Sequence, residues 1–181
     1  MKIKLTNAEI LNLFAALDSI DTRGNAKFTY TLSKNRAILK HNVEALQEAG
    51  NSYTKNNDRF TEYQSKAEEI VKRFAVNKDG TPSMRTAADG QTMQRVIPAE
   101  KMGEFAKERE ALDDDYKDVL LGIQAHQAGF AQLLKEESEV DLRILPIKDI
   151  PDGGISTQVM NLIFVFVEDE KQDAPALKLV H

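Results

Sequence analysis

A seven-residue apolar repeat dominates the first half of the chain. It consists of Leu32, Leu39, Leu46, Tyr53, Phe60, Ala67 and Phe74. An unbroken repeat of this period lets a helix bury one narrow stripe by left-handed supercoiling, as in a coiled coil. A second seam, three residues further on, begins with Asn35 and Asn42, and buried asparagines at such positions fix register or partner number. The pattern predicts one long helix from about Ala26 to Phe74.

A second pair of seven-residue series follows Pro98, a residue that suits the first turn of a helix. One series is Met102, Arg109, Tyr116, Ile123 and Phe130, and the other is Phe105, Leu112, Val119, His126 and Leu133. At ~1.5 Å per residue both helices would be about 60–70 Å long. The match in length predicts an antiparallel coiled-coil hairpin over residues 26–137, in which Tyr53 faces Val119 and Leu46 lies near His126.

Turn residues interrupt the pattern between the two long helices. The Asp79-Gly80 and Asp89-Gly90 pairs tolerate the positive φ values of tight turns. We therefore expect a β-hairpin or an ordered loop over residues 75–97, at the tip of the coiled-coil hairpin.

Both ends of the chain carry signals for a small α+β base. Residues 1–5 and 140–144 alternate apolar and polar side chains, which is typical of half-buried strands that pair with each other. Thr6 and Glu9 fit a capping box at the start of a short helix. Ser156 or Thr157 can cap a last element, Val159–Val167, which fits a helix or a buried strand, and we favour the helix.

These elements predict a mainly α protein with minor β-structure. The expected base consists of residues 1–25 and 138–170, the coiled-coil hairpin of 26–137, and a loose charged tail of 171–181.

The composition narrows the classes of function. The net charge of −5 argues against bulk attraction to nucleic acid or anionic membrane. The absence of cysteine excludes disulfides and cysteine-ligated zinc. The sequence shows neither a signal peptide nor an apolar run of the ~20 residues that span a bilayer. We expect a soluble protein of a cytoplasm.

No catalytic motif is recognisable in the sequence. A Gly-rich phosphate loop, paired histidine ligands and a nucleophile elbow are all lacking. We interpret Asp113-Asp114-Asp115 as a solvated helix face and His126 as a polar seam residue that bonds an asparagine. The prediction is a protein without enzymatic activity, metal or cofactor.

One stripe of a predicted helix gathers basic residues beside an aromatic ring. It consists of Arg23, Lys27, Tyr30, Lys34 and His41, which helical spacing places along one line outside the seam. The stripe is either an ordinary solvated face or a candidate site for phosphate or an acidic protein surface.

Several features in order resemble a family of small proteins of unknown function encoded by tailed bacteriophages, mostly of Gram-positive hosts. They are the MKIKL start, the helix ending at Gly24 with Lys27 and Lys34 after it, the Asp-Gly turns, the stretch FAKEREAL (105–112), the strand at 140–147 and the Ile155-Ser-Thr start of the last element. The resemblance implies a viral origin and action in the host cytoplasm or the virion, and it carries no activity. By topology alone, the hairpin also looks like a prefoldin subunit, whose assemblies hold unfolded proteins.

Three hypotheses follow for the function. The first is a module that binds a host or phage protein. The second is an inhibitor of a bacterial anti-phage defence system, which binds a host protein or sequesters a nucleotide at the basic stripe. The third is a scaffold or chaperone-like protein in virion assembly, which would form a homo-oligomer.

Overall fold

The computed structural model describes residues 1–20, 26–88 and 90–168. Helix accounts for 66% and strand for 14% of the structure, which confirms a mainly α protein with small sheets. The elements are β1 (Lys2–Thr6), α1 (Asn7–Ser19), α2 (Ala26–Lys55), α3 (Asp58–Phe74), β2 (Met84–Thr86), β3 (Met93–Arg95), α4 (Met102–Asp115), α5 (Lys117–Leu133), β4 (Glu137–Asp141), β5 (Leu145–Pro146), α6 (Thr157–Ile163) and β6 (Val167–Glu168). Short 3₁₀ helices span Ala99–Lys101, Ile147–Asp149 and Phe164–Phe166.

The chain divides into two compact units. Unit 1 comprises Met1–Ala49 and Phe130–His181, and unit 2 comprises Gly50–Gly129. Helices α2 and α5 each contribute residues to both units. The domain boundaries expected from the sequence stay a prediction.

The two ends of the chain pair in unit 1, as the sequence predicts. Strand β1 runs antiparallel to β4, and Ile3 lies opposite Val140. The strand β4 begins at Glu137 and ends at Asp141, so it starts earlier than the alternation at 140–144 indicates. The capping box at Thr6 is confirmed, since Thr6 Oγ1 accepts from the Glu9 amide and the Glu9 carboxylate accepts from the Thr6 amide.

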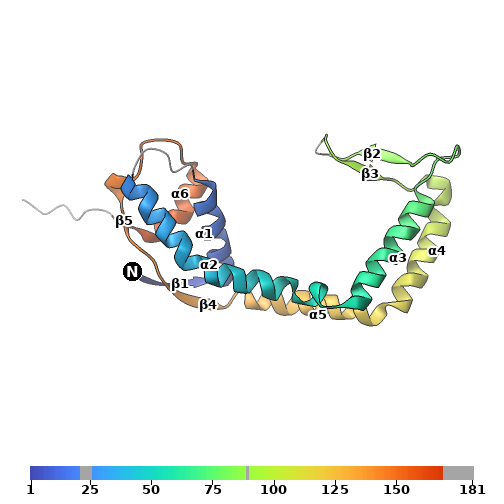
Figure 1. The fold of residues 1–181 in the computed structure, drawn as a ribbon, viewed down its shortest axis with the longest axis horizontal. Coiled ribbons are helices and arrows are strands. Elements are labelled where there is room, and N and C mark those ends of the chain that lie inside the picture. Colours follow the sequence, from blue (N-terminus) through green and yellow to red (C-terminus); the bar gives the residue numbers. More distant parts are fainter. Residues whose placement is uncertain (21–25, 89, 169–181) are drawn as a thin grey trace, which may run out of the picture. The chain divides into compact units, whose positions relative to one another are not determined.

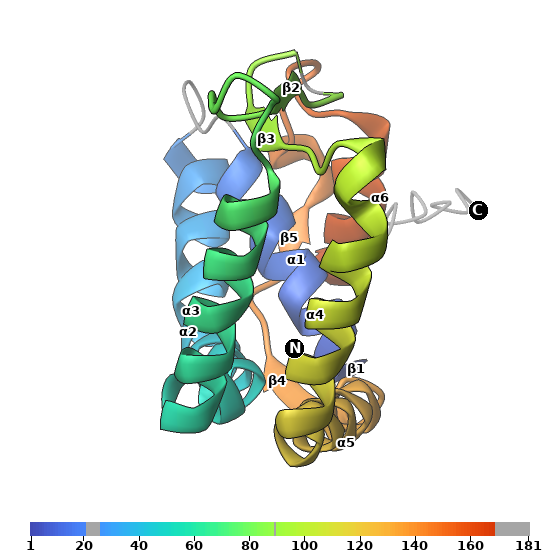
Figure 2. The same cartoon turned by 90° about the vertical axis from the view of Figure 1, so that its right-hand side faces the viewer.

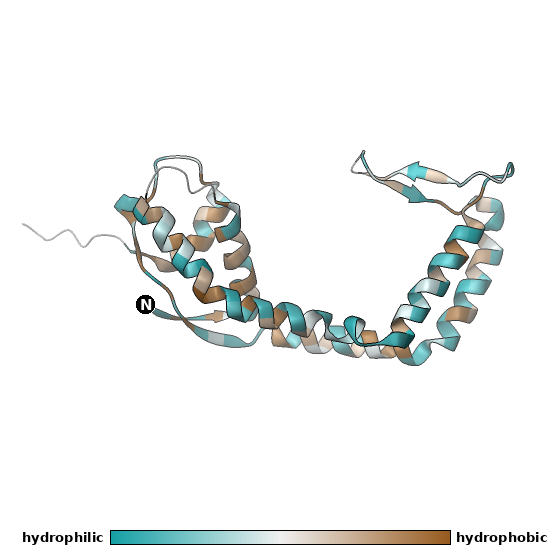
Figure 3. Ribbon diagram, in the orientation of Figure 1, coloured by the Kyte–Doolittle hydropathy of each residue, from teal (hydrophilic) through white to brown (hydrophobic). Residues whose placement is uncertain are grey.

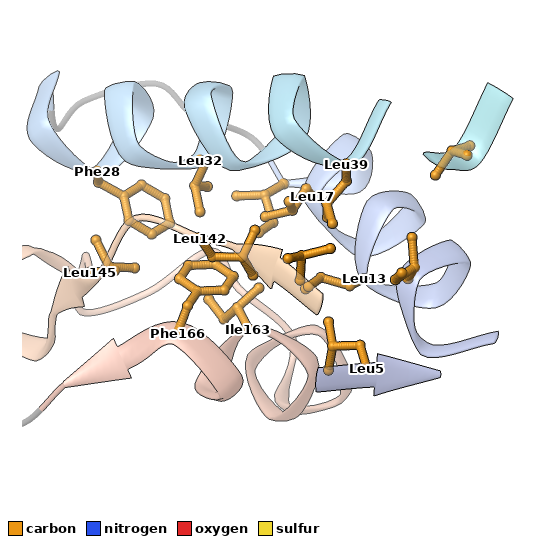
Figure 4. Close-up of a cluster of buried hydrophobic side chains, with 14 residues drawn as sticks. Leu5, Leu13, Leu17, Phe28, Leu32, Leu39, Leu142, Leu145, Ile163 and Phe166 are labelled. Carbon is orange, nitrogen blue, oxygen red and sulfur yellow. The ribbon is translucent and has the colours of Figure 1, made fainter. Parts of the chain in front are cut away.

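One apolar core holds unit 1 together. Helix α2 contributes Phe28, Leu32 and Leu39, which point toward Leu142 and Phe166 (Figure 4). Helix α1 is mainly hydrophobic in Figure 3, and its buried residues include Ile10, Leu13 and Leu17. The remaining fully packed members are Leu5, Ile10, Leu13, Leu17, Ile20, Val43, Val140, Leu145 and Ile163.

Neither long helix is continuous, so the prediction of an unbroken helix from Ala26 to Phe74 is wrong. Helix α2 ends at Lys55, and α3 starts at Asp58 after Asn57, whose side chain accepts from the Phe60 amide at 3.0 Å. Asparagine favours such caps because its side chain competes with helical hydrogen bonds.

The second helix breaks at Tyr116, between α4 and α5. The carboxylates of residues 113–115 oppose the dipole at the end of α4 and suit the start of α5. A continuous coiled-coil hairpin over 26–137 is therefore not confirmed.

Within unit 2 the helices pair in antiparallel fashion, as predicted. Figure 1 and Figure 2 both show α3 and α4 side by side. A cluster of Tyr63, Leu112, Tyr116 and Val119 forms the centre of this packing. The expected contact of Tyr53 with Val119 is confirmed, since the Tyr53 hydroxyl donates to the Val119 carbonyl at 3.0 Å.

The segment between α3 and α4 forms the expected β-hairpin. Strands β2 and β3 pair antiparallel, with Met84 opposite Arg95. Gly80 and Gly90 have φ values of 83° and 70°, as the two Asp-Gly turns require.

The last described segment combines the two alternatives that the sequence left open. Ser156 caps α6 by accepting from the Val159 amide at 3.3 Å. The helix ends at Ile163, a 3₁₀ turn follows, and β6 pairs parallel with β5. The favoured prediction of a helix over Val159–Val167 is thus right only for its first half.

Candidate partner-binding cleft

Helix α2 presents two different faces within unit 1. Phe28, Leu32 and Leu39 bury one face in the core. The neighbouring face carries Lys27, Tyr30, Thr31, Lys34 and Ile38, which helical spacing places along one line. Tyr30 is 52% exposed on this face although it is a large aromatic residue. This face of α2, with the exposed ring of Tyr30 and the cations Lys27 and Lys34, is therefore available for binding.

The buried side chain of Asn35 fixes the chain segment opposite this face. Asn35 is fully buried in α2, where its Nδ2 donates to the Arg143 carbonyl at 2.9 Å and its Oδ1 accepts from the Arg143 amide at 2.7 Å. The sequence predicts a register-fixing role for this residue between two helices. Its partner is instead the backbone that follows β4.

A cleft of about 610 Å³ lies between the exposed face of α2 and this segment. Its lining residues are Met1, Lys27, Tyr30, Thr31, Ile38, Asp141, Leu142, Arg143, Ile144 and Asp149. All of them belong to unit 1. The volume lies in the range typical of ligand-binding clefts. We refer to it as the Tyr30 cleft.

Two cations converge on the ring of Tyr30. The Lys34 Nζ lies 5.6 Å from the ring centroid, and the Arg143 Cζ lies 5.4 Å from it. Cation–π attraction at an exposed ring contributes about 0.5–1 kcal/mol for each cation. The ring therefore holds together two positive charges that come from distant parts of the sequence.

The acidic residues of the cleft moderate its positive charge. Asp141 accepts a hydrogen bond from the amine of Met1 at 2.8 Å, and this contact lowers the pKa of its carboxyl group. Asp149, the last residue of the 3₁₀ helix Ile147–Asp149, also lines the cleft and is half-buried. The cleft consequently combines apolar, cationic and anionic groups and is not a uniform phosphate cradle.

The structure brings together three of the five residues of the predicted basic stripe. Lys27 and Tyr30 line the cleft, and Lys34 lies beside the Tyr30 ring. His41 is exposed on α2 and is not among the lining residues. Arg23 lies outside the described residues.

Arg143 is the cation of the cleft that the sequence analysis did not identify as a site residue. It occupies a polar position in the alternation at 140–144, which only indicates a strand. The available signal was Asn35, since a buried asparagine must find hydrogen-bond partners, but its sequence position does not say which backbone supplies them.

The histidine and aspartates considered from the sequence have structural partners in unit 2. The His126 Nε2 lies 3.1 Å from the Gly50 carbonyl oxygen, and its ring stacks on Tyr53. The expected bond from His126 to an asparagine is therefore wrong, because the partner of its Nε2 is a backbone carbonyl of α2. In the described ranges no cluster of three or more acidic or histidine side chains could hold a metal ion.

Asp114 and Asp115 are exposed, as expected for a solvated helix face, whereas Asp113 also takes part in a hydrogen-bond network. Asp113 accepts from the Tyr63 hydroxyl at 2.8 Å and from the Arg109 Nε at 3.1 Å. The Arg109 guanidinium also contacts the Tyr63 hydroxyl and lies 5.1 Å from the centroid of its ring. Desolvation and the Asp113 carboxylate raise the pKa of Tyr63. These contacts join α3 to α4 and explain the residues without invoking catalysis.

Neither a family model nor a curated protein nor a solved structure matches the chain. In the described part of the chain, no helix combines the length and the hydropathy needed to cross a bilayer.

Proposed function

We propose that this protein is a non-enzymatic interaction module that binds a partner protein through the Tyr30 cleft of unit 1. The observation that carries the proposal is the gathering of exposed apolar side chains at this cleft. Of the eleven large hydrophobic side chains exposed in the described residues, four line it: Met1, Tyr30, Ile38 and Ile144. Exposed apolar groups that cluster beside polar ones mark interaction sites.

The resemblance to phage-encoded proteins supplies the setting of the proposal. The partner would be a host or phage protein, met in the host cytoplasm or in the virion, and the role would be accessory to infection.

Affinity purification with matched variants tests the proposal. The wild-type protein, a Lys34→Glu/Arg143→Glu double variant and a Lys40→Glu control would each be purified from infected and uninfected bacteria. Lys40 lies on α2 but away from the cleft, where it pairs with Glu44 at 3.6 Å. We expect one protein partner that the wild type and the control retain and the double variant loses. A partner retained equally by all three would refute the use of this cleft.

Sequestration of a nucleotide is the second candidate, and the cations beside the Tyr30 ring favour it. Such groups can hold a phosphate and stack a base. The same eluates, analysed for small molecules, would then contain a nucleotide with the wild type and the control only. Co-purified capsid or tail proteins, or a homo-oligomer in light scattering, would instead support a role in virion assembly.

A further inference from the structure

The mixed chemistry of the Tyr30 cleft indicates the kind of partner segment that it accepts. Cations flank one exposed ring, and aliphatic side chains of Ile38 and Ile144 line the same cleft. A ligand that satisfies both parts carries a negative charge next to an apolar group. The inference below rests on the proposed function and specifies its ligand.

Arg143 and Lys34 are suited to a single carboxylate. Arginine binds carboxylates through a planar, bidentate set of donors, and lysine adds a point charge. Asn35 fixes the backbone of Arg143 at both its amide and its carbonyl, and the Tyr30 ring restrains the two cationic side chains. Groups ordered before binding lose less conformational entropy when the ligand arrives.

Two features disfavour polyphosphates and nucleic acid at this position. Asp141 and Asp149 line the same cleft and would repel each additional negative charge of a polyanion. The chain as a whole carries a net charge of −5, which opposes the approach of a phosphate backbone. A carboxylate with one charge fits between these acidic residues more easily.

We propose that the Tyr30 cleft binds an acidic–apolar peptide segment of a partner protein. An Asp or Glu side chain of this segment contacts Arg143 and Lys34, and a neighbouring aliphatic or aromatic side chain packs against Ile38 and Ile144. Asn35 acts as a positioning residue for Arg143.

A selection from a random linear peptide library tests this inference with the full chain. The three proteins to compare are the wild type, the Lys34→Glu/Arg143→Glu double variant and the Lys40→Glu control. We expect the wild type and the control to enrich peptides with Asp or Glu next to an apolar residue. The double variant should enrich Lys or Arg at the same peptide position and bind the wild-type peptides about tenfold to a hundredfold more weakly. A damaged fold would lose binding without this exchange of charge.

The outcomes separate the inference from the function on which it rests. Enriched peptides without acidic residues, or peptides that ADP displaces at a concentration close to their own, would overturn the inference while leaving a binding cleft. The proposed function itself would be overturned if no peptide is enriched and the wild type and the double variant co-purify the same proteins. If circular dichroism shows that the double variant is unfolded, Lys34→Gln/Arg143→Gln replaces it. Unchanged binding by that variant would also refute the inference.

Discussion

The close approach of Gly122 to Tyr53 predicts opposite effects for the same substitution at two positions of α5. A Cβ atom at Gly122 would lie 2.7 Å from Tyr53 Cζ and 2.9 Å from Cε2, and closer still to the hydroxyl oxygen. At Gly129, on the same helix, a Cβ would meet no atom within 4 Å. Both glycines are helical, so the gain in helix propensity from alanine is shared and the contact with Tyr53 is the difference.

The magnitudes follow from these contacts. Replacing a helical glycine with alanine stabilises a helix by about 0.5–1 kcal/mol, and this is the whole effect expected at Gly129. At Gly122 the ring must move, which strains its hydrogen bond to Val119 and its stacking on His126. Overpacking of this kind costs about 1–3 kcal/mol. We expect Gly122→Ala to lower the free energy of unfolding and Gly129→Ala to raise it, with a difference of about 2 kcal/mol between them.

Urea denaturation followed by circular dichroism measures this difference. In a Tyr53→Ala background the obstructing ring is absent, so Gly122→Ala should become neutral or stabilising there. Equal midpoints for the two alanine variants in the wild-type background would refute the argument, since they would show that Tyr53 does not pack against Gly122.

Three further predictions concern unit 1. Asn35→Ala should lower the free energy of unfolding by about 2–4 kcal/mol in urea denaturation, because it leaves a buried amide and carbonyl without partners and opens a cavity. Thr6→Ala should cost about 1 kcal/mol through loss of the helix cap. Hydrogen bonds from the amide and the hydroxyl of Thr6 lower the pKa of Glu9 below its ordinary value of 4.5, so Glu9 contributes stability above that pH and loses it as the pH falls through the folded pKa. Melting temperatures recorded against pH should show a weaker decline on the acid side for Thr6→Ala than for the wild type. Gly154→Ala should cost about 1–2 kcal/mol in thermal melts because its φ is 87°, whereas Gly153→Ala should have little effect.

Local signals in the sequence predicted local structure well. The capping box at Thr6, the Asp-Gly turns and the Ser156 cap each depend on a few neighbouring residues, and the structure contains all three. The pairing of β1 with β4 was also predictable, since a chain that reverses once must return its second half to its start.

The breaks in the long helices were not predictable from the apolar repeat alone. A heptad pattern records which positions are buried, and it continues across Asn57 and Tyr116 without change. What ends each helix is a competing local interaction, such as the bond from the Phe60 amide to Asn57. A straight helix also drifts away from a heptad, which is why Val43 and not Asn42 is buried in α2.

The sequence predicted only the part of the candidate site that lies on α2. Helical spacing alone placed Lys27, Tyr30 and Lys34 on one face. Arg143 lies 113 residues further along the chain than Tyr30, and the hydrogen bonds of Asn35 and the burial of Leu142 and Leu145 hold its segment beside α2. A contact that joins such distant residues leaves no periodic trace in the sequence.

The discontinuity of unit 1 determines when the Tyr30 cleft can exist during protein synthesis. In the sequence, unit 2 is one uninterrupted stretch, Gly50–Gly129, and the two segments of unit 1 precede and follow it. Domains fold as units while the ribosome extends the chain from its N-terminus. Unit 2 can therefore fold before the ribosome has synthesised β4, the partner of β1, and Arg143, the partner of Asn35. A nascent chain displays the helical face of the cleft first, and the complete cleft that we propose as a binding site can form only after Arg143 has left the ribosome.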